Sequence, residues 1–147
     1  MLQEKSAGII VVASNGIHVR YLLLHYGGRY WGFPKGNIEA EESVLQAAIR
    51  ETKEETGLTN ITLINGFREK IAYHYRRNNR LVHKEVVYFL AETTAKADTV
   101  ILSHEHSGFK WVEFTEAHEL LTYETTRHIL EKAHLLYTQI KGHIQSK

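Results

Sequence analysis

The chain has 147 residues, of which 43% are hydrophobic and 24% are charged, as expected for one ordinary globular domain spanning residues 1–147. The net charge of +1 excludes a strong overall field for nucleic acid or an anionic membrane. The absence of cysteine excludes disulfides and thiolate metal sites, and it fits a reducing compartment without requiring one. We find neither a secretion signal nor the roughly 18 apolar residues of a membrane span, and we expect a soluble, cytoplasmic protein.

The first elements predicted along the chain are two strands and an irregular segment. Residues 7–13 and 19–25 are short apolar runs rich in β-branched side chains, and Ser-Asn-Gly at 14–16 separates them. This pattern predicts two strands joined by a turn. Residues 27–37 are glycine-rich and hold the only proline, which predicts a loop or an irregular strand with exposed backbone amides.

Over residues 42–55 the apolar residues recur at the spacing of an α-helix. One helical stripe is formed by Val44, Leu45, Ala48 and Thr52. Gly57 follows as a natural residue to end the helix, because glycine readily adopts the left-handed conformation found there.

The second half of the chain predicts a hairpin, a further strand and two helices. Residues 61–75 and 83–92 are both extended in pattern and are separated by a turn sequence, so we expect them to pair. Residues 108–114 predict a short strand, residues 115–121 a short helix capped by their leading threonine, and residues 124–144 a long amphipathic helix. Strands and helices mix without strict alternation, which favours an α+β fold or an α/β/α sandwich.

Three glutamates crowd the end of the 42–55 helix. Glu51 is three residues from Glu54 and four from Glu55, so the three side chains converge on one region of the helix surface. Arg50 and Lys53 can neutralise part of this charge, which leaves a solvated acidic patch as one interpretation. However, negative charge is unfavourable at a helix C-terminus. A divalent cation would turn the repulsion into coordination, because hard cations prefer carboxylate oxygens.

The frame around these glutamates resembles the Nudix box, G-x5-E-x7-R-E-U-x-E-E-x-G-U, where U is a bulky apolar residue. The matching residues are Gly36, Glu42, Arg50, Glu51, Glu54, Glu55, Gly57 and Leu58. Thr52 departs from the pattern, although its methyl group can still pack. Eight fixed positions over 23 residues make the resemblance specific. It implies the Nudix fold, a mixed β-sheet between helices, and a metal-dependent hydrolase of phosphoanhydride bonds.

The resemblance also implies roles for residues of the box. Glu54 and Glu55 correspond to the principal ligands of Mg²⁺ or Mn²⁺, and Glu51 to a further ligand or the base. The carbonyl of Gly36 can reach the metal, and Arg50 orients a glutamate.

Glu42 is expected to cap the first helical turn and to reach a metal through water. The implied chemistry is attack of water on a phosphoanhydride, with the cation neutralising phosphate charge and lowering the pKa of the water. Electrostatic stabilisation of this kind is the main requirement of phosphoryl transfer.

Segments outside the box resemble the asymmetrical diadenosine tetraphosphate (Ap4A) hydrolases, which cut Ap4A to ATP and AMP. These segments are residues 31–36, 87–92 and 103–121. The resemblance implies that Glu105 supplies a carboxylate to the site as a catalytic group or metal ligand. The neighbouring His104 and His106 also allow a zinc site or simple loop polarity, although no third zinc ligand is evident.

The resemblance implies a substrate site beside the box. Lys35 is placed to meet a phosphate, and Tyr73 and Tyr123 correspond to an aromatic clamp on adenine, where stacking contributes roughly 1–3 kcal/mol per base. Core packing is the alternative for both tyrosines. Asn37 stands where a histidine is common, so it keeps hydrogen bonding but loses a titratable group. Tyr88 is expected in the core or the wall of the site.

Lys84 belongs to a basic cluster around the predicted hairpin turn, together with Arg76, Arg77 and Arg80. Most of these side chains are expected to be solvated, while one or two can contact a polyphosphate. The sequence therefore predicts a Nudix hydrolase that acts on Ap4A or a related dinucleoside polyphosphate. The alternatives are an RNA 5′-triphosphate end, a nucleoside triphosphate or a diphosphoinositol polyphosphate as substrate, or a catalytically silent nucleotide sensor.

Overall fold

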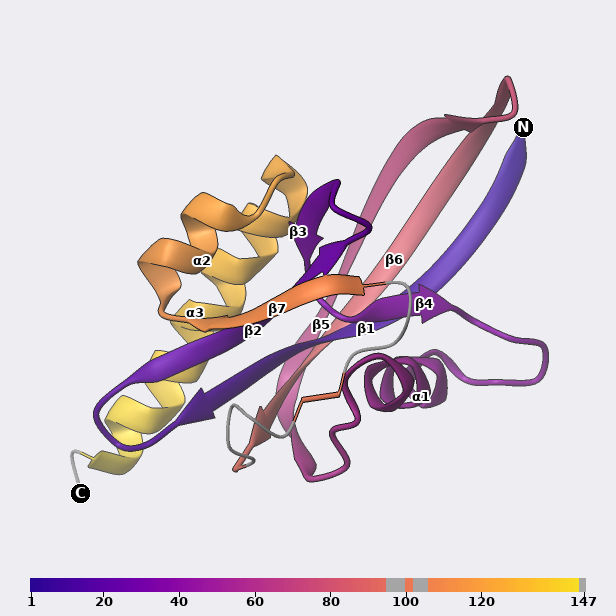
Figure 1. The fold of residues 1–147 in the computed structure, drawn as a ribbon. Coiled ribbons are helices and arrows are strands. Elements are labelled where there is room, and N and C mark those ends of the chain that lie inside the picture. Colours follow the sequence, from indigo (N-terminus) through magenta and orange to yellow (C-terminus); the bar gives the residue numbers. More distant parts are fainter. Residues whose placement is uncertain (95–99, 102–105, 146–147) are drawn as a thin grey trace.

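The computed structural model describes residues 1–94, 100–101 and 106–145, and these form one mixed sheet with helices on both faces (Figure 1). The strands are β1 (Leu2–Ser14), β2 (Val19–Tyr26), β3 (Tyr30–Gly32), β4 (Lys35–Asn37), β5 (Ile61–Arg77), β6 (Arg80–Thr93) and β7 (His106–Val112). The helices are α1 (Val44–Thr56), α2 (Phe114–Leu120) and α3 (Glu124–Gln145). The expected mixed sheet between helices is confirmed.

The parallel pair β1–β6 lies at the centre of the sheet. The strand order is β3-β2-β1-β6-β5, with β4 paired to β1 and β7 paired to β2. All these pairings except β1–β6 are antiparallel. The β5–β6 hairpin turns at Asn78 and Asn79, whose positive φ angles of 51° and 65° suit a tight hairpin turn. This hairpin and the first residues of β1 project together from the body (Figure 1).

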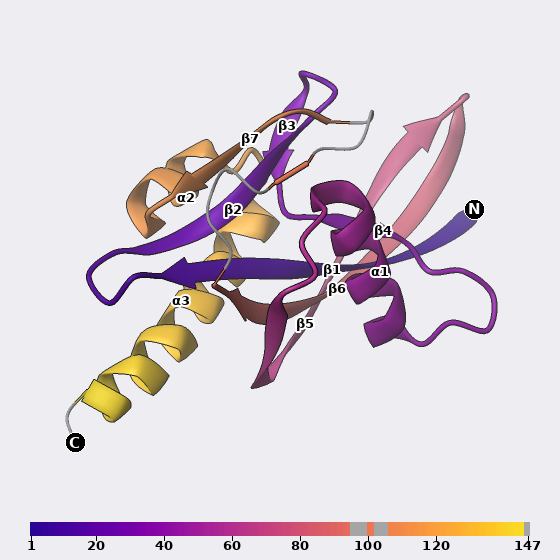
Figure 2. The ribbon, with the colours of Figure 1, turned by 60° about the horizontal axis from the view of Figure 1, so that its bottom comes forward.

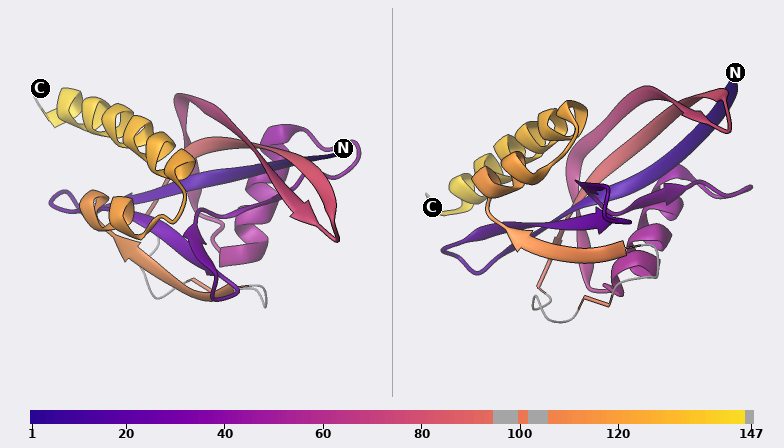
Figure 3. Two further views of the ribbon diagram at one scale, coloured as in Figure 1. Left: turned by 90° about the horizontal axis from the view of Figure 1, so that it is seen from above. Right: turned by 45° about the horizontal axis from the view of Figure 1, so that its top comes forward.

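Two hydrophobic clusters lie on opposite faces of the sheet because successive strand residues point to opposite sides. Ile9 and Val11 pack in one cluster with Ala48 of α1, while Ile10 packs in the other with Ala133 of α3. Figures 2 and 3 show α1 on one side of β1 and β6, and α2 and α3 on the other. The box helix is thereby fixed to one face, and the other face is left to form a cavity beside α3.

Two predicted boundaries need correction. The first strand begins at Leu2 rather than residue 7, because residues 2–6, which are polar apart from Leu2, pair with β6. Thr115 does not cap α2: it lies inside the helix, and Glu113 occupies the N-cap position without a side-chain capping bond. In the part of the chain that the structure describes, no helix is long and apolar enough to cross a bilayer.

Candidate active site

The ends of α1 are fixed by local hydrogen bonds. The Ser43 side chain accepts from the Gln46 N–H at 3.0 Å, and the Gln46 side chain accepts from the Ser43 N–H at 2.9 Å. This is a capping box. Gly57 ends the helix with φ 75°, and its N–H donates to the Lys53 carbonyl at 2.8 Å. The prediction that Glu42 caps the helix is therefore wrong, because Ser43 holds that position.

Arg50 connects the acidic residues of the box. Its Nε donates to Glu42 Oε2 at 2.6 Å, and its Nη1 donates to Glu51 Oε1 at 2.8 Å and to Glu54 Oε2 at 3.2 Å. The pairing of Arg50 with Glu54, predicted from their spacing, is confirmed. Hydrogen bonding to Arg50 lowers the pKa of Glu42 to about 2. Arg50 therefore favours the charged form of Glu42 and hydrogen-bonds all three carboxylates.

Gly36 lets the Glu51 carboxylate approach the backbone of β4. A β-carbon added at Gly36 would lie 2.0 Å from Glu51 Cδ and 2.1 Å from Oε2. Any larger residue would have to displace that carboxylate. Glycine is thus required at position 36 because a side chain would clash with Glu51, and not because of its backbone angles.

Glu55 points into the protein instead of outward. It is buried, with 4% of its surface exposed, and it accepts a hydrogen bond from the Lys35 N–H at 2.9 Å. His106 lies on its other side, with Nε2 3.7 Å from Glu55 Oε2. His106 was predicted as a loop residue, but it is a buried residue of β7 whose ring lies edge-on to Tyr26. No spacing in the sequence joined it to Glu55.

The donor set of this region suits a hard divalent cation. Glu51, Glu54 and Glu55 offer carboxylate oxygens and Gly36 a carbonyl, which are ligands that Mg²⁺ and Mn²⁺ prefer. Among the described residues, no group of three histidine or acidic side chains is already arranged to hold a metal ion. Glu51 and Glu54 are turned to Arg50, so metal binding would require their carboxylates to rotate. The predicted Glu105 lies outside the described residues, as does His104.

A cavity of about 610 Å³ opens on the sheet face that carries α3. Its lining includes predicted substrate residues from three separate parts of the chain, namely Lys35, Tyr73, Lys84 and Tyr123. Tyr88 is fully buried and forms part of the wall, as expected. Asn37 does not line the cavity, because its side chain accepts from Ser6 at 3.0 Å and its carbonyl accepts from Arg50.

Lys35 joins the cavity to the box. Its N–H binds Glu55, while its ammonium lies 5.4 Å from the Tyr26 ring centroid and 5.8 Å from that of Tyr30. Burial, and then the neighbouring Lys84, lower the pKa of Lys35 to about 8. A phosphate beside Lys35 would restore the charge that burial disfavours.

Tyr30 is an element of the site that the sequence analysis missed. It stacks on Tyr26 with centroids 4.8 Å apart and a 7° interplanar angle, and it lies 5.3 Å from Tyr123. Its hydroxyl accepts from Lys35 Nζ at 3.5 Å. Burial raises the pKa of Tyr30 to about 12, so the hydroxyl keeps its proton. Aromatic residues on both sides of the 27–28 glycine pair were the available signal.

The basic cluster of the hairpin divides between solvent and cavity. Arg77 forms an ion pair with Glu4, and Arg76 donates to the Asn79 carbonyl at 3.4 Å. Lys84 lies 3.6 Å from Glu4 and is the member of the cluster that lines the cavity. The expectation that most of these side chains are solvated is confirmed, because all three arginines are exposed.

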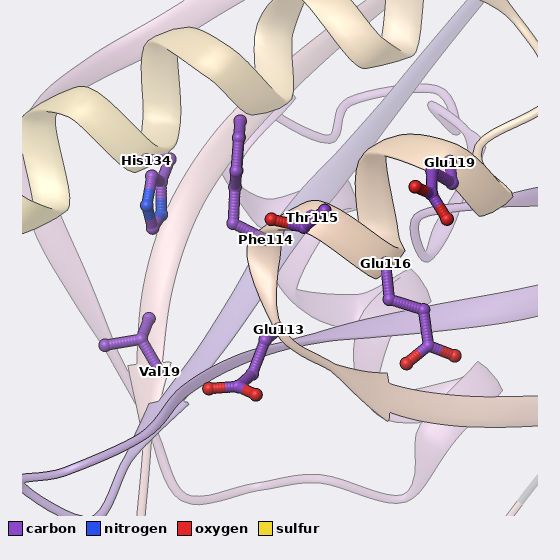
Figure 4. A pocket seen from close by; sticks show the side chains of 7 residues that line it. All are labelled: Val19, Glu113, Phe114, Thr115, Glu116, Glu119 and His134. Carbon is purple, nitrogen blue, oxygen red and sulfur yellow. The ribbon is translucent and has the colours of Figure 1, made fainter.

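A second depression of about 660 Å³ lies between α2, α3 and the start of β2. Figure 4 shows the carboxylates of Glu113, Glu116 and Glu119 around it, with His134 on α3. These carboxylates would repel a phosphate chain, whereas Lys35 and Lys84 attract one. We therefore assign the candidate substrate site to the cavity beside the box.

Comparison with known proteins identifies the family of the chain. The family model for the NUDIX domain matches residues 3–133. The chain is 35% identical over 128 residues to the asymmetrical bis(5′-nucleosyl)-tetraphosphatase of Sus scrofa, covering 86% of this chain and 77% of the relative. It is 29% identical over 122 residues to an RNA pyrophosphohydrolase of Halorhodospira halophila, covering 74% of this chain and 66% of the relative.

A crystal structure of a C. elegans Ap4A hydrolase binary complex superimposes with a TM-score of 0.82 at 31% identity, covering 92% of this chain and 98% of the other. The chain therefore belongs to the Nudix hydrolase family. It is a pyrophosphohydrolase of that family, similar to the asymmetrical Ap4A hydrolases. Members of the family typically depend on divalent metal ions.

Proposed function

We propose that the protein hydrolyses Ap4A asymmetrically, to ATP and AMP. The observation that carries the proposal is the continuity between cavity and box at Lys35. Its ammonium faces the cavity with Tyr73 and Tyr123, while its backbone N–H holds Glu55. A nucleotide bound in the cavity would thus present its phosphate chain to the acidic residues.

In the proposed reaction, a water oxygen bonds to one phosphorus and the bridging P–O bond breaks. Mg²⁺ or Mn²⁺, when bound, would supply charge neutralisation and activate the water. Lys35 and Lys84 bind the phosphates, and Tyr73 and Tyr123 bind an adenine by stacking. Glu51, Glu54 and Glu55 would hold the metal with the Gly36 carbonyl, and Glu105 is proposed as a further carboxylate of the site. Arg50 positions Glu51 and Glu54.

The deciding experiment offers a panel of substrates with Mg²⁺ and identifies the products by chromatography. The panel contains Ap4A, a nucleoside triphosphate, a diphosphoinositol polyphosphate and RNA with a 5′-triphosphate end. We expect ATP and AMP in equal amounts from Ap4A, with the highest kcat/KM of the panel. Processing of RNA with Ap4A left intact would overturn the substrate assignment. Tight Ap4A binding without any turnover would indicate a nucleotide sensor instead.

A further inference from the structure

Two histidines face each other across the β5–β6 hairpin, at the border of the cavity that His74 helps to line. His74 is the register partner of His83, and His83 Nδ1 lies 3.1 Å from His74 Nε2. Successive strand residues point to opposite faces, so both imidazoles lie on the face opposite Tyr73 and Lys84. The roles proposed above for the box and for the cavity do not use these two imidazoles.

The spacing of the two nitrogens suits a metal ion. Zinc binds imidazole nitrogen at about 2.0–2.1 Å, and two ligands of a tetrahedral ion then lie about 3.3 Å apart. The observed separation of 3.1 Å is close to this value, and both rings would have to turn so that their lone pairs meet at one ion. We propose that His74 Nε2 and His83 Nδ1 form a binding site for Zn²⁺.

Glu85 lies near the ring nitrogen of His83 that would not bind the metal. It lies two residues from His83 on the same strand face, and its Oε2 is 3.8 Å from His83 Nε2. Histidines that ligate metals commonly donate their other ring N–H to a carboxylate, which leaves the ligating nitrogen free of its proton. Lys70 competes for Glu85 at 3.6 Å, but its side chain is 59% exposed and can turn away.

The small number of protein ligands limits the affinity of this site for zinc. Within the residues that the structure describes, no third histidine or carboxylate completes a group of three, so water must fill the remaining positions. Binding is consequently reversible and weaker than at a closed structural site. A bound ion would link the two strands whose opposite face carries Tyr73 and Lys84. The alternative is a histidine pair joined only by one hydrogen bond.

The test titrates Zn²⁺ into the full chain in excess Mg²⁺, which keeps the hard-oxygen donors of the box occupied. Binding is followed by calorimetry and by ¹⁵N NMR of the histidine rings. We expect shifts at His74 Nε2 and His83 Nδ1, and roughly tenfold or more weaker binding in His74→Ala and His83→Ala. His128→Ala is the matched control, because its exposed histidine lies on α3 and should leave the titration unchanged.

Equal zinc affinity in wild type and both variants would overturn the proposal, and so would zinc-induced shifts confined to other histidines. The NMR measurement uses the unmodified protein, so it decides the question even where a variant folds poorly. Because the readout is binding rather than turnover, the result is independent of the proposed Ap4A hydrolysis.

Discussion

Gly36 and Glu51 lie so close that a β-carbon on the first would fall 2.0 Å from the carboxyl carbon of the second. Gly36→Ala should therefore displace a flexible carboxylate while leaving the fold intact. We expect kcat to fall about tenfold or more, which corresponds to about 1.4 kcal/mol in the barrier. The melting temperature should change little. Gly142→Ala, where an added β-carbon meets nothing within 4 Å, is the control and should keep full activity.

Glu54→Gln should remove a metal-binding charge without harming stability. The Glu54 side chain is 58% exposed, and it lies near the C-terminus of α1, where a negative charge is unfavourable. We expect turnover to be abolished and the thermal unfolding curve to stay unchanged. Glu119→Gln, in the depression beside α2, serves as the control. Full activity of Glu54→Gln across a Mg²⁺ titration would refute the metal assignment.

Lys35 should make nucleotide affinity depend on pH. Because its pKa is lowered to about 8, the ammonium loses its proton as pH rises through that value, and attraction for phosphate falls. The dissociation constant of a non-hydrolysable Ap4A analogue should therefore increase between pH 7 and pH 9. In Lys35→Arg the increase should disappear, because a guanidinium stays charged over this range. Identical pH profiles for the two proteins would contradict a phosphate-binding role.

Arg50 should control part of the acid sensitivity of the fold. The pKa of Glu42 is lowered from 4.5 to about 2, so the unfolded chain binds this proton at a higher pH than the folded one. The stability from this pair is present above pH 4.5 and is lost as pH falls towards 2. Arg50→Ala should reduce this loss, measured as melting temperature against pH. An unchanged slope would show that other carboxylates dominate.

Tyr123 should contribute to nucleotide binding through its ring alone. The residue is 53% exposed, so replacing it should not disturb the core. Tyr123→Ala should weaken AMP binding by about 1–3 kcal/mol, the range for stacking on one base. Tyr123→Phe should bind nearly as well as wild type. Calorimetry compares the three proteins, and equal losses in both variants would point to the hydroxyl instead.

Local patterns in the sequence predict the helix of the box well. The stripe of apolar residues, the glycine at its end and the i,i+4 pairing of Arg50 with Glu54 all depend on neighbours within a few positions. The N-cap was misassigned although serine is preferred at that position and Ser43 with Gln46 carries the capping-box signature. In the structure, Arg50 occupies the Glu42 carboxylate.

Local sequence patterns do not predict contacts between residues that are far apart in the chain. The place of Tyr30 beside Tyr123, and of His106 beside Glu55, depends on how β3, β7 and the helices meet. The start of β1 was missed for a similar reason. Apart from Leu2, its first residues are polar, and they become a strand through pairing with β6, which follows much later in the chain.

The parallel pairing of β1 with β6 has a kinetic consequence. Leu2 lies opposite Val82 and Ile10 opposite Leu90, so the central ladder forms only after a long loop of chain has closed. Such non-local contacts slow folding, because the entropy of closure is lost before the contacts form. During synthesis, β1 must wait for β6 to leave the ribosome, and its apolar stretch stays without its central partner until then.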